Sequence, residues 1–196
     1  MLAQQLTFDL AKEFSLDEND KKRSVLYVSL EMSANLLTSR AIAMTNTIPF
    51  DKLVNTDRMN EGDWENLSSI LETMSVYPIT VNDDSSSSIS DILADIHKLN
   101  VLYDTKFLVV DYLQLLPGTD DVTGIDYIVN EVHRIAVAQS LHVLLISSLS
   151  NEGRLRGSRG TQYSADNVFM LEKMDADGNK GSMWDNIVKI NATKVR

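Results

Sequence analysis

The stretch from Phe107 to Leu116, Phe-Leu-Val-Val-Asp-Tyr-Leu-Gln-Leu-Leu, constrains the fold of this chain more than any other feature. Four apolar residues, two of them β-branched, run directly into Asp111. A continuous apolar run of this kind predicts a strand that is buried on both faces, as in a parallel sheet covered by helices. Open α/β sheets bind ligands outside the carboxyl ends of their strands, which is where Asp111 would lie.

A carboxylate at that position is costly unless a positive partner lies beside it. A magnesium ion on a nucleotide phosphate would be such a partner, and the apolar run ending in Asp111 has the Walker B form of P-loop ATPases. The alternative is a buried strand whose terminal aspartate only caps a turn. The residues that follow Asp111 decide between the two interpretations, as described below.

Apolar periodicity predicts further strands and helices that alternate along the chain. Strands are expected at 25–30, 77–81, 107–110 and 143–148, and helices at 2–14, 33–44, 60–74, 90–101 and 125–140. Two more strands, 167–171 and 186–193, are separated by a turn and predict an antiparallel hairpin. The alternation predicts an α/β fold, a mostly parallel sheet flanked by helices with a C-terminal antiparallel hairpin.

Two of the expected helices are amphipathic. In the first, Leu2, Leu6, Leu10 and Phe14 recur every four residues and predict the apolar face. In the helix 60–74, one face carries Trp64, Leu67, Ile70, Leu71 and Met74. Ser33 precedes the second helix and is a plausible N-cap residue.

Composition excludes several classes of protein. The chain of 196 residues suits one domain, and without cysteine it has no disulfide framework and no thiolate metal site. No apolar run approaches membrane-spanning length, and the start lacks the basic region of a signal peptide, so we expect a cytoplasmic location. The net charge of −10 argues against a nucleic-acid interface over the whole surface. Local basic clusters remain at Arg154, Arg156 and Arg159 and at Lys189, Lys194 and Arg196.

Four segments resemble the motifs of the DnaB-type replicative helicases, in the order that family has them. They are 109–115 (Val-Val-Asp-Tyr-Leu-Gln-Leu), 29–33 (Ser-Leu-Glu-Met-Ser), 155–158 with 165–166 (Leu-Arg-Gly-Ser and Ala-Asp), and 194–196 (Lys-Val-Arg). The resemblance covers nearly the whole chain. It implies a RecA-like P-loop ATPase core, and it favours the Walker B interpretation of Asp111.

No segment of the 196 residues has the phosphate-binding pattern G-x-x-x-x-G-K-[ST], and 178–182 has the wrong spacing. In the family, the helix that resembles residues 2–14 directly follows that loop. The resemblance therefore implies one RecA-like helicase ATPase domain over 1–196, truncated at the N-terminus and before the family's final C-terminal turn. A degenerate natural domain without the loop is the alternative. In either case we expect the isolated chain to be inactive.

The resemblance implies roles for residues near the nucleotide, with ATP and Mg²⁺ as cofactors. Glu31 matches the glutamate that polarises the attacking water, Arg40 a position that faces the nucleotide, and Asp111 the carboxylate that holds Mg²⁺ through water. Ser148 stands where the family has a γ-phosphate sensor, usually Gln or His. Because serine is shorter, we favour a strand-end serine there. The other three residues also have alternatives without a role at the nucleotide. Glu31 would be an exposed glutamate at a helix start, Arg40 a solvated helix arginine, and Asp111 the cap of a turn.

Two basic segments match family positions that touch DNA or the neighbouring subunit. Arg156, Gly157 and Arg159 match contacts to the DNA backbone, which basic groups and free N–H groups can make. Lys194 and Arg196 match the finger that reaches into the neighbour's ATP site and stabilises transition-state charge. A solvated basic loop and a basic strand end are the alternatives.

The resemblance implies part of an ATP-dependent hexameric replicative DNA helicase that translocates on single-stranded DNA and unwinds the duplex. The implied partners are single-stranded DNA, other subunits of a hexameric ring, and a primase and a helicase loader. Two alternatives stay open: a P-loop-less paralogue that acts as a non-catalytic interaction module in helicase rings, and a recombinase-like RecA relative. The segment 112–115 (Tyr-Leu-Gln-Leu) favours the helicase over the recombinase.

Overall fold

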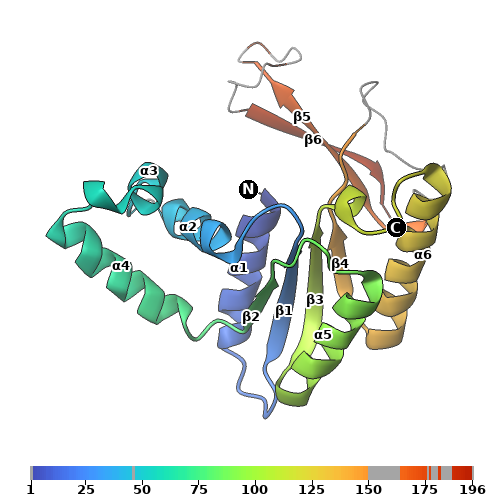
Figure 1. Ribbon diagram of the computed structural model, residues 1–196, viewed down its shortest axis with the longest axis horizontal. Helices are drawn as coiled ribbons and strands as arrows, with labels where there is room; N and C mark the ends of the chain where they lie inside the picture. Colours follow the sequence, from blue (N-terminus) through green and yellow to red (C-terminus); the bar gives the residue numbers. More distant parts are fainter. Residues whose placement is uncertain are drawn as a thin grey trace.

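The computed structural model describes residues 2–45, 47–149, 164–175, 177, 181 and 187–195, and Figure 1 shows the path of the chain. The helices are α1 (Leu2–Ser15), α2 (Ala34–Met44), α3 (Phe50–Val54), α4 (Glu61–Met74), α5 (Ile89–Leu102) and α6 (Val122–Gln139), with 3₁₀ turns η1 (Thr56–Arg58) and η2 (Leu113–Leu115). The strands are β1 (Arg23–Ser29), β2 (Ile79–Asn82), β3 (Asp104–Asp111), β4 (His142–Leu145), β5 (Val168–Met174) and β6 (Ile187–Lys194). This order confirms the predicted alternation of strands and helices.

Four strands form a parallel sheet in the order β2-β1-β3-β4. The two central strands are the apolar runs that the sequence singled out, and β1 is buried from Ser24 to Ser29. Their register places Val25 opposite Phe107 and Ser29 opposite Asp111. The strand of Asp111 therefore lies inside a parallel sheet, as predicted.

Helices cover both faces of this sheet, so the molecule has three layers. On one face, α1 and α2 contact the sheet through Ala11, Phe14 and Leu37. On the other face, α5 and α6 form the larger core with β1 and β3. The buried members of that core from the two helices are Ile92, Ile96, Ile125, Ile128, Val129, Val132 and Ile135. Coverage on both faces explains why the central strands are continuous apolar runs.

Side-chain caps begin four of the helices. The side chain of Ser33 accepts a hydrogen bond from the Leu36 amide at 3.4 Å, which confirms the predicted N-cap of α2. Asn60 and Ser88 form capping boxes at α4 and α5, and Asp121 accepts from the Gly124 amide at 2.7 Å to begin α6. Each cap satisfies a backbone N–H that would otherwise lack a partner.

The apolar stripe expected on α1 only partly matches its buried face. Leu2 and Leu6 are 53% and 44% exposed. The buried residues of this helix are Gln4, Thr7, Ala11 and Phe14. They recur every three to four residues, which keeps them on one face of a 3.6-residue helix, whereas a strict interval of four drifts around it. Gln4 is tolerated inside because its amide donates to the Leu37 carbonyl of α2.

Beyond α2, the segment of α3 and α4 extends away from the sheet (Figure 1). Lys52 of α3 pairs with Asp63 of α4 at 2.6 Å, so this ion pair joins the two helices. The apolar face of α4 is partly exposed, with Trp64 at 47% and Leu71 at 43%. The helix therefore forms as predicted, although much of its apolar face is not covered by the described residues.

The predicted C-terminal hairpin is confirmed as a separate two-stranded antiparallel sheet, in which Leu171 lies opposite Ile190. Figure 1 shows it beyond the carboxyl ends of the parallel strands. Among the described residues, no helix is both long enough and apolar enough to cross a membrane.

Candidate active site

Glu31 follows the central strand β1, and Asp111 ends the central strand β3 at the same edge of the sheet. Ser29 lies opposite Asp111, and the next amide, that of Leu30, donates to the Asp111 carbonyl at 2.8 Å. Glu31 is the residue directly after this contact. The carboxyl ends of β1 and β3 thus present one carboxylate each where parallel α/β sheets bind ligands.

A short turn fixes the backbone around Glu31. The buried hydroxyl of Ser29 donates to the Met32 carbonyl at 2.6 Å and lies 3.2 Å from the Met32 amide. Ser33 then caps α2, and the Ala34 amide donates to Asp83 at 2.7 Å. Glu31 itself is exposed. An exposed carboxylate on a fixed turn can accept a proton from a water molecule.

Asp111 is held by a buried phenol. The hydroxyl of Tyr27 on β1 donates to Asp111 Oδ2 at 2.7 Å, and Tyr27 is only 2% exposed. Burial raises the pKa of the Tyr27 phenol far above its usual value, and the hydrogen bond and negative charge of Asp111 raise it further. The Tyr27 hydroxyl therefore keeps its proton at neutral pH and can donate to the Asp111 carboxylate.

Arg40 on α2 lies close enough to Tyr27 for its charge to affect the pKa of the phenol. Its positive charge acts against the rise in the pKa of Tyr27 that burial and Asp111 cause. The guanidinium carbon also lies 6.0 Å from the centre of the Phe50 ring, at the outer range of a cation–π contact. Arg40, Tyr27 and Asp111 thus lie in one electrostatic environment on the face of the sheet that α2 covers.

The end of β4 is tied to the segment after Asp111. Strand β4 ends at Leu145, three residues before the predicted end at 148. Beyond it, the Leu113 amide donates to the Ile146 carbonyl at 2.8 Å. The side chain of Gln114 accepts from the Ser148 amide at 3.0 Å and donates to the Ser147 hydroxyl at 2.8 Å. Ser148 is therefore brought to this edge through Gln114, and it lies past the strand rather than within it.

Lys194 is the described residue of the expected finger. It ends β6, is half-buried, and its ammonium group donates to the Ala165 carbonyl. The adjacent Ser164 hydroxyl bonds to Asn130 of α6 at 2.8 Å. Arg196 and the expected DNA contacts Arg156, Gly157 and Arg159 lie outside the described residues.

The donor set at this edge fits a magnesium ion that is bound mainly by a nucleotide. Within the described ranges, no group of three or more His, Cys, Asp and Glu side chains could hold a metal by itself. Mg²⁺ in nucleotide sites takes one or two carboxylates and completes its shell with phosphate oxygens and water. Asp111 is a half-buried carboxylate at a strand end and suits that role.

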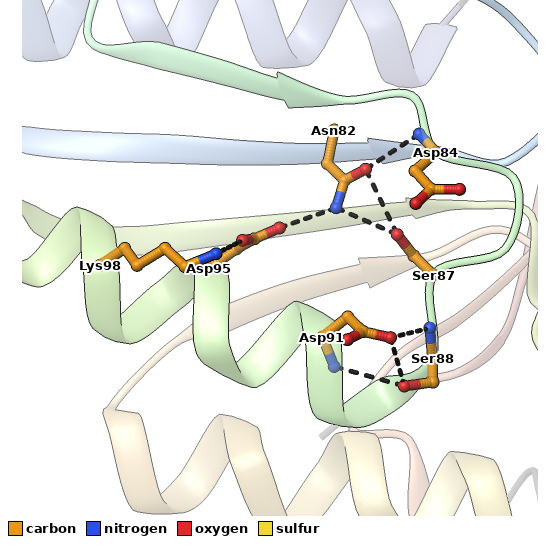
Figure 2. A network of polar contacts seen from close by, with 7 residues as sticks. All are labelled: Asn82, Asp84, Ser87, Ser88, Asp91, Asp95 and Lys98. Atoms are coloured by element: carbon orange, nitrogen blue, oxygen red, sulfur yellow. Dashed lines mark hydrogen bonds and ion pairs between the residues drawn. The ribbon is translucent and has the colours of Figure 1, made fainter.

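A separate acidic cavity lies between β2 and α5. It has a volume of about 550 Å³ and is lined in part by Asp84, Asp91 and Asp95. Figure 2 shows that the carboxylates have local partners: Asp91 belongs to the capping box of α5, and Asp95 bonds to Asn82 and Lys98. The pKa of Asp91 is lowered mainly by its hydrogen bond from Ser88. These contacts stabilise the loop between β2 and α5 and the first turn of α5.

The sequence predicted no individual role for two residues of the candidate site, Tyr27 and Gln114. Tyr27 is the only aromatic residue in an otherwise aliphatic and serine-containing buried strand, and a buried tyrosine hydroxyl usually needs a partner. That requirement is the signal that could have identified it. Gln114 lies in the segment 112–115 that resembles the helicase family, but its partners could not be predicted because they follow a strand end more than thirty residues away.

Comparison with known proteins gives a consistent result. The family model for the DnaB-like helicase C terminal domain matches residues 3–191. The replicative DNA helicase DnaB of Rickettsia bellii is 32% identical over 154 residues, which cover 75% of this chain and 30% of that protein. The DnaB of Geobacillus stearothermophilus is 31% identical over 189 residues, covering 88% of this chain and 41% of that protein. The chain thus spans about a third of the length of the curated relatives that it matches.

Solved structures show the same fold. One solved ATPase domain superposes with a TM-score of 0.77 at 24% identity, over 99% of this chain and 74% of that chain. A DnaB-like replicative helicase, solved in a study of its interactions with primase, gives the same TM-score and identity over 50% of its length. The sheet, the helical layers and the hairpin therefore form a RecA-like fold. With the family model matching nearly every residue, the chain belongs to the DnaB-like helicase C-terminal domain family.

Proposed function

We propose that this chain is the ATPase core of a replicative DNA helicase subunit, and that its sheet edge hydrolyses ATP to drive movement along single-stranded DNA. The observation that carries the proposal is the pair of carboxylates, Glu31 and Asp111, at the carboxyl ends of adjacent central strands. Family membership supports the same conclusion.

Each residue at the edge has a role that its chemistry suits. Bound MgATP would supply the phosphoryl group that is transferred to water. Glu31 is exposed and accepts the proton of the attacking water. Asp111 would hold the Mg²⁺ ion of the nucleotide through water, and the Tyr27 hydroxyl keeps the carboxylate in one orientation. Arg40 supplies positive charge from α2.

A ring of subunits completes this site. Lys194 and Arg196 would act in trans, at the ATP site of the neighbouring subunit in a hexamer, where an arginine finger stabilises transition-state charge. Arg156, Gly157 and Arg159 would contact the phosphates of single-stranded DNA. A helicase loader and a primase are the further partners, and one structural neighbour was solved with reference to its primase interactions. The proposed location is the cytoplasm.

A second function is favoured by one sequence observation. The 196 residues contain no G-x-x-x-x-G-K-[ST] motif, whose backbone would cradle the phosphates. We therefore propose two forms of the domain: an ATPase domain that works in a subunit carrying the loop, or a non-catalytic module that joins helicase rings. A phosphate-binding loop in the same reading frame, upstream of this chain, would decide for the first.

Steady-state ATP hydrolysis by a full-length subunit that carries such a loop tests the proposal. Single-stranded DNA should stimulate the rate. Glu31→Gln should lower it by roughly 10²- to 10⁴-fold, which is the usual contribution of a general base. Glu65→Gln, an exposed glutamate on α4, is the matched control and should not change it. A Glu31→Gln subunit with the wild-type rate would refute the assignment.

A further inference from the structure

Gln114 joins two strand ends that the chain does not connect directly. It lies three residues after Asp111, in η2, and its side chain contacts the segment leaving β4. The backbone of η2 is fixed, because Leu113 and Leu116 are buried and the Thr119 hydroxyl lies 3.0 Å from the Gln114 carbonyl oxygen. The Gln114 amide thus extends from a rigid turn.

The contact uses both ends of the amide. Its oxygen accepts from the Ser148 amide at 3.0 Å, and its nitrogen donates to the Ser147 hydroxyl at 2.8 Å. The register between β3 and β4 ends with Val110 opposite Leu145, and the Leu113 amide then bonds to the Ile146 carbonyl. The Gln114 side chain extends this connection to Ser147 and Ser148. In sequence, Ser148 is followed eight residues later by Arg156, the first of the expected DNA contacts.

We propose that Gln114 is a positioning residue that couples the nucleotide edge to the DNA loop. It does so by holding Ser147 and Ser148, where the chain leaves β4, in a fixed position relative to the turn that follows Asp111. This inference rests on the proposed helicase function. A displacement of the β3 end during the ATP cycle is passed to the exit of β4 through the Gln114 amide, and from there along the chain.

The chemistry of the contact defines two informative variants. Gln114→Met keeps a straight side chain of similar length but removes both hydrogen bonds. Gln114→Glu keeps the acceptor for the Ser148 amide, and the Ser147 hydroxyl can rotate to donate to the carboxylate. Gln139→Met is the matched control, because Gln139 also bridges two elements, with its amide 3.4 Å from His97, but far along α6 from this edge.

Hydrogen exchange in the isolated chain tests whether the Gln114 side chain holds the Ser148 amide, and it requires no enzymatic activity. In Gln114→Met, the Ser148 amide should exchange at least about fivefold faster, the equivalent of one lost hydrogen bond. The amides of β1 should be unchanged, and Gln114→Glu and Gln139→Met should both protect Ser148 as the wild type does. Unchanged exchange of Ser148 in Gln114→Met would overturn the proposal.

ATP hydrolysis by the full-length subunit tests the coupling. The readout is the ratio of the rate with single-stranded DNA to the rate without it, since general destabilisation lowers both rates together. Gln114→Met should lower this ratio about tenfold, and Gln114→Glu should restore most of it. A changed Ser148 exchange with an unchanged ratio would overturn the coupling. If the wild-type rate were the same with and without single-stranded DNA, the proposed function would be refuted. The hydrogen-exchange result would still decide whether Gln114 holds the Ser148 amide.

Discussion

Removing the hydroxyl of Tyr27 isolates one hydrogen bond at the centre of the site. Tyr27→Phe keeps the ring among Leu37 and Val109 and deletes only the O–H that donates to Asp111 Oδ2 at 2.7 Å. The ring is 2% exposed, so no water replaces the hydroxyl without rearrangement. The variant therefore changes the support of Asp111 and leaves the packing of the sheet in place.

The expected cost follows from the partner's charge and exposure. Hydrogen bonds to a charged group contribute roughly 1.5–3 kcal/mol. Because Asp111 is half-buried, water can recover part of that, and we expect a loss of about 1–2 kcal/mol in the free energy of unfolding. For a domain of this size the loss corresponds to a Tm lowered by roughly 2–8 °C.

Chemical and thermal unfolding at neutral pH measure this loss. Tyr77→Phe is the control, because its ring is half-buried against the α1 side of the sheet and it lacks a carboxylate partner among the described residues. In an Asp111→Ala background, Tyr27→Phe should cost less than about 0.5 kcal/mol, since the acceptor is gone. An equal loss in the presence and absence of Asp111 would refute the reasoning.

Three further predictions concern pH, a helix end and the isolated chain. The Arg23 side chain, 2.7 Å from Asp17, lowers the pKa of Asp17 from 3.8 to about 2, so the pair stabilises the fold above about pH 4 and loses that effect as the pH falls to 2. Unfolding of Asp17→Asn should accordingly show a stability deficit at pH 7 that vanishes near pH 2, whereas the exposed Asp20→Asn should show none. Ser140 follows the last turn of α6 with a φ of 53°, a left-handed conformation that is strained for serine but not for glycine. Ser140→Gly should therefore raise the free energy of unfolding in urea by roughly 0.5–1 kcal/mol, and a lower free energy of unfolding would contradict this reasoning. The isolated chain should hydrolyse ATP negligibly in a steady-state assay, and turnover stimulated by single-stranded DNA would contradict this.

The sequence was sufficient to predict the sheet and the position of the two carboxylates. Buried parallel strands must be apolar along their whole length, so β1 and β3 can be recognised directly, and the polar residue that ends each run marks the ligand edge. The same logic predicted the hairpin of β5 and β6 and the Ser33 cap. These features depend on local patterns, which one sequence contains in full.

The remaining features depend on neighbours that no local pattern specifies. The buried face of α1 includes Gln4 because a carbonyl of α2 receives its amide, and the apolar stripe of Leu2 and Leu6 is partly exposed. The hydrogen bonds of Tyr27 and Gln114 join segments that lie 84 and more than 30 residues apart in the sequence. Such contacts are set by tertiary packing, which periodicity and propensity do not encode.

Complementation between two inactive subunits tests most directly whether the ATP site is built from Glu31 of one subunit and Arg196 of the next. In full-length subunits with a phosphate-binding loop, Arg196→Ala should leave ATP binding nearly intact and lower hydrolysis by about 10³- to 10⁵-fold, as for other arginine fingers. Mixing it with Glu31→Gln should restore measurable hydrolysis, because some sites in mixed rings then receive both intact halves. Failure to restore hydrolysis in rings proven to be mixed would contradict a finger that acts in trans.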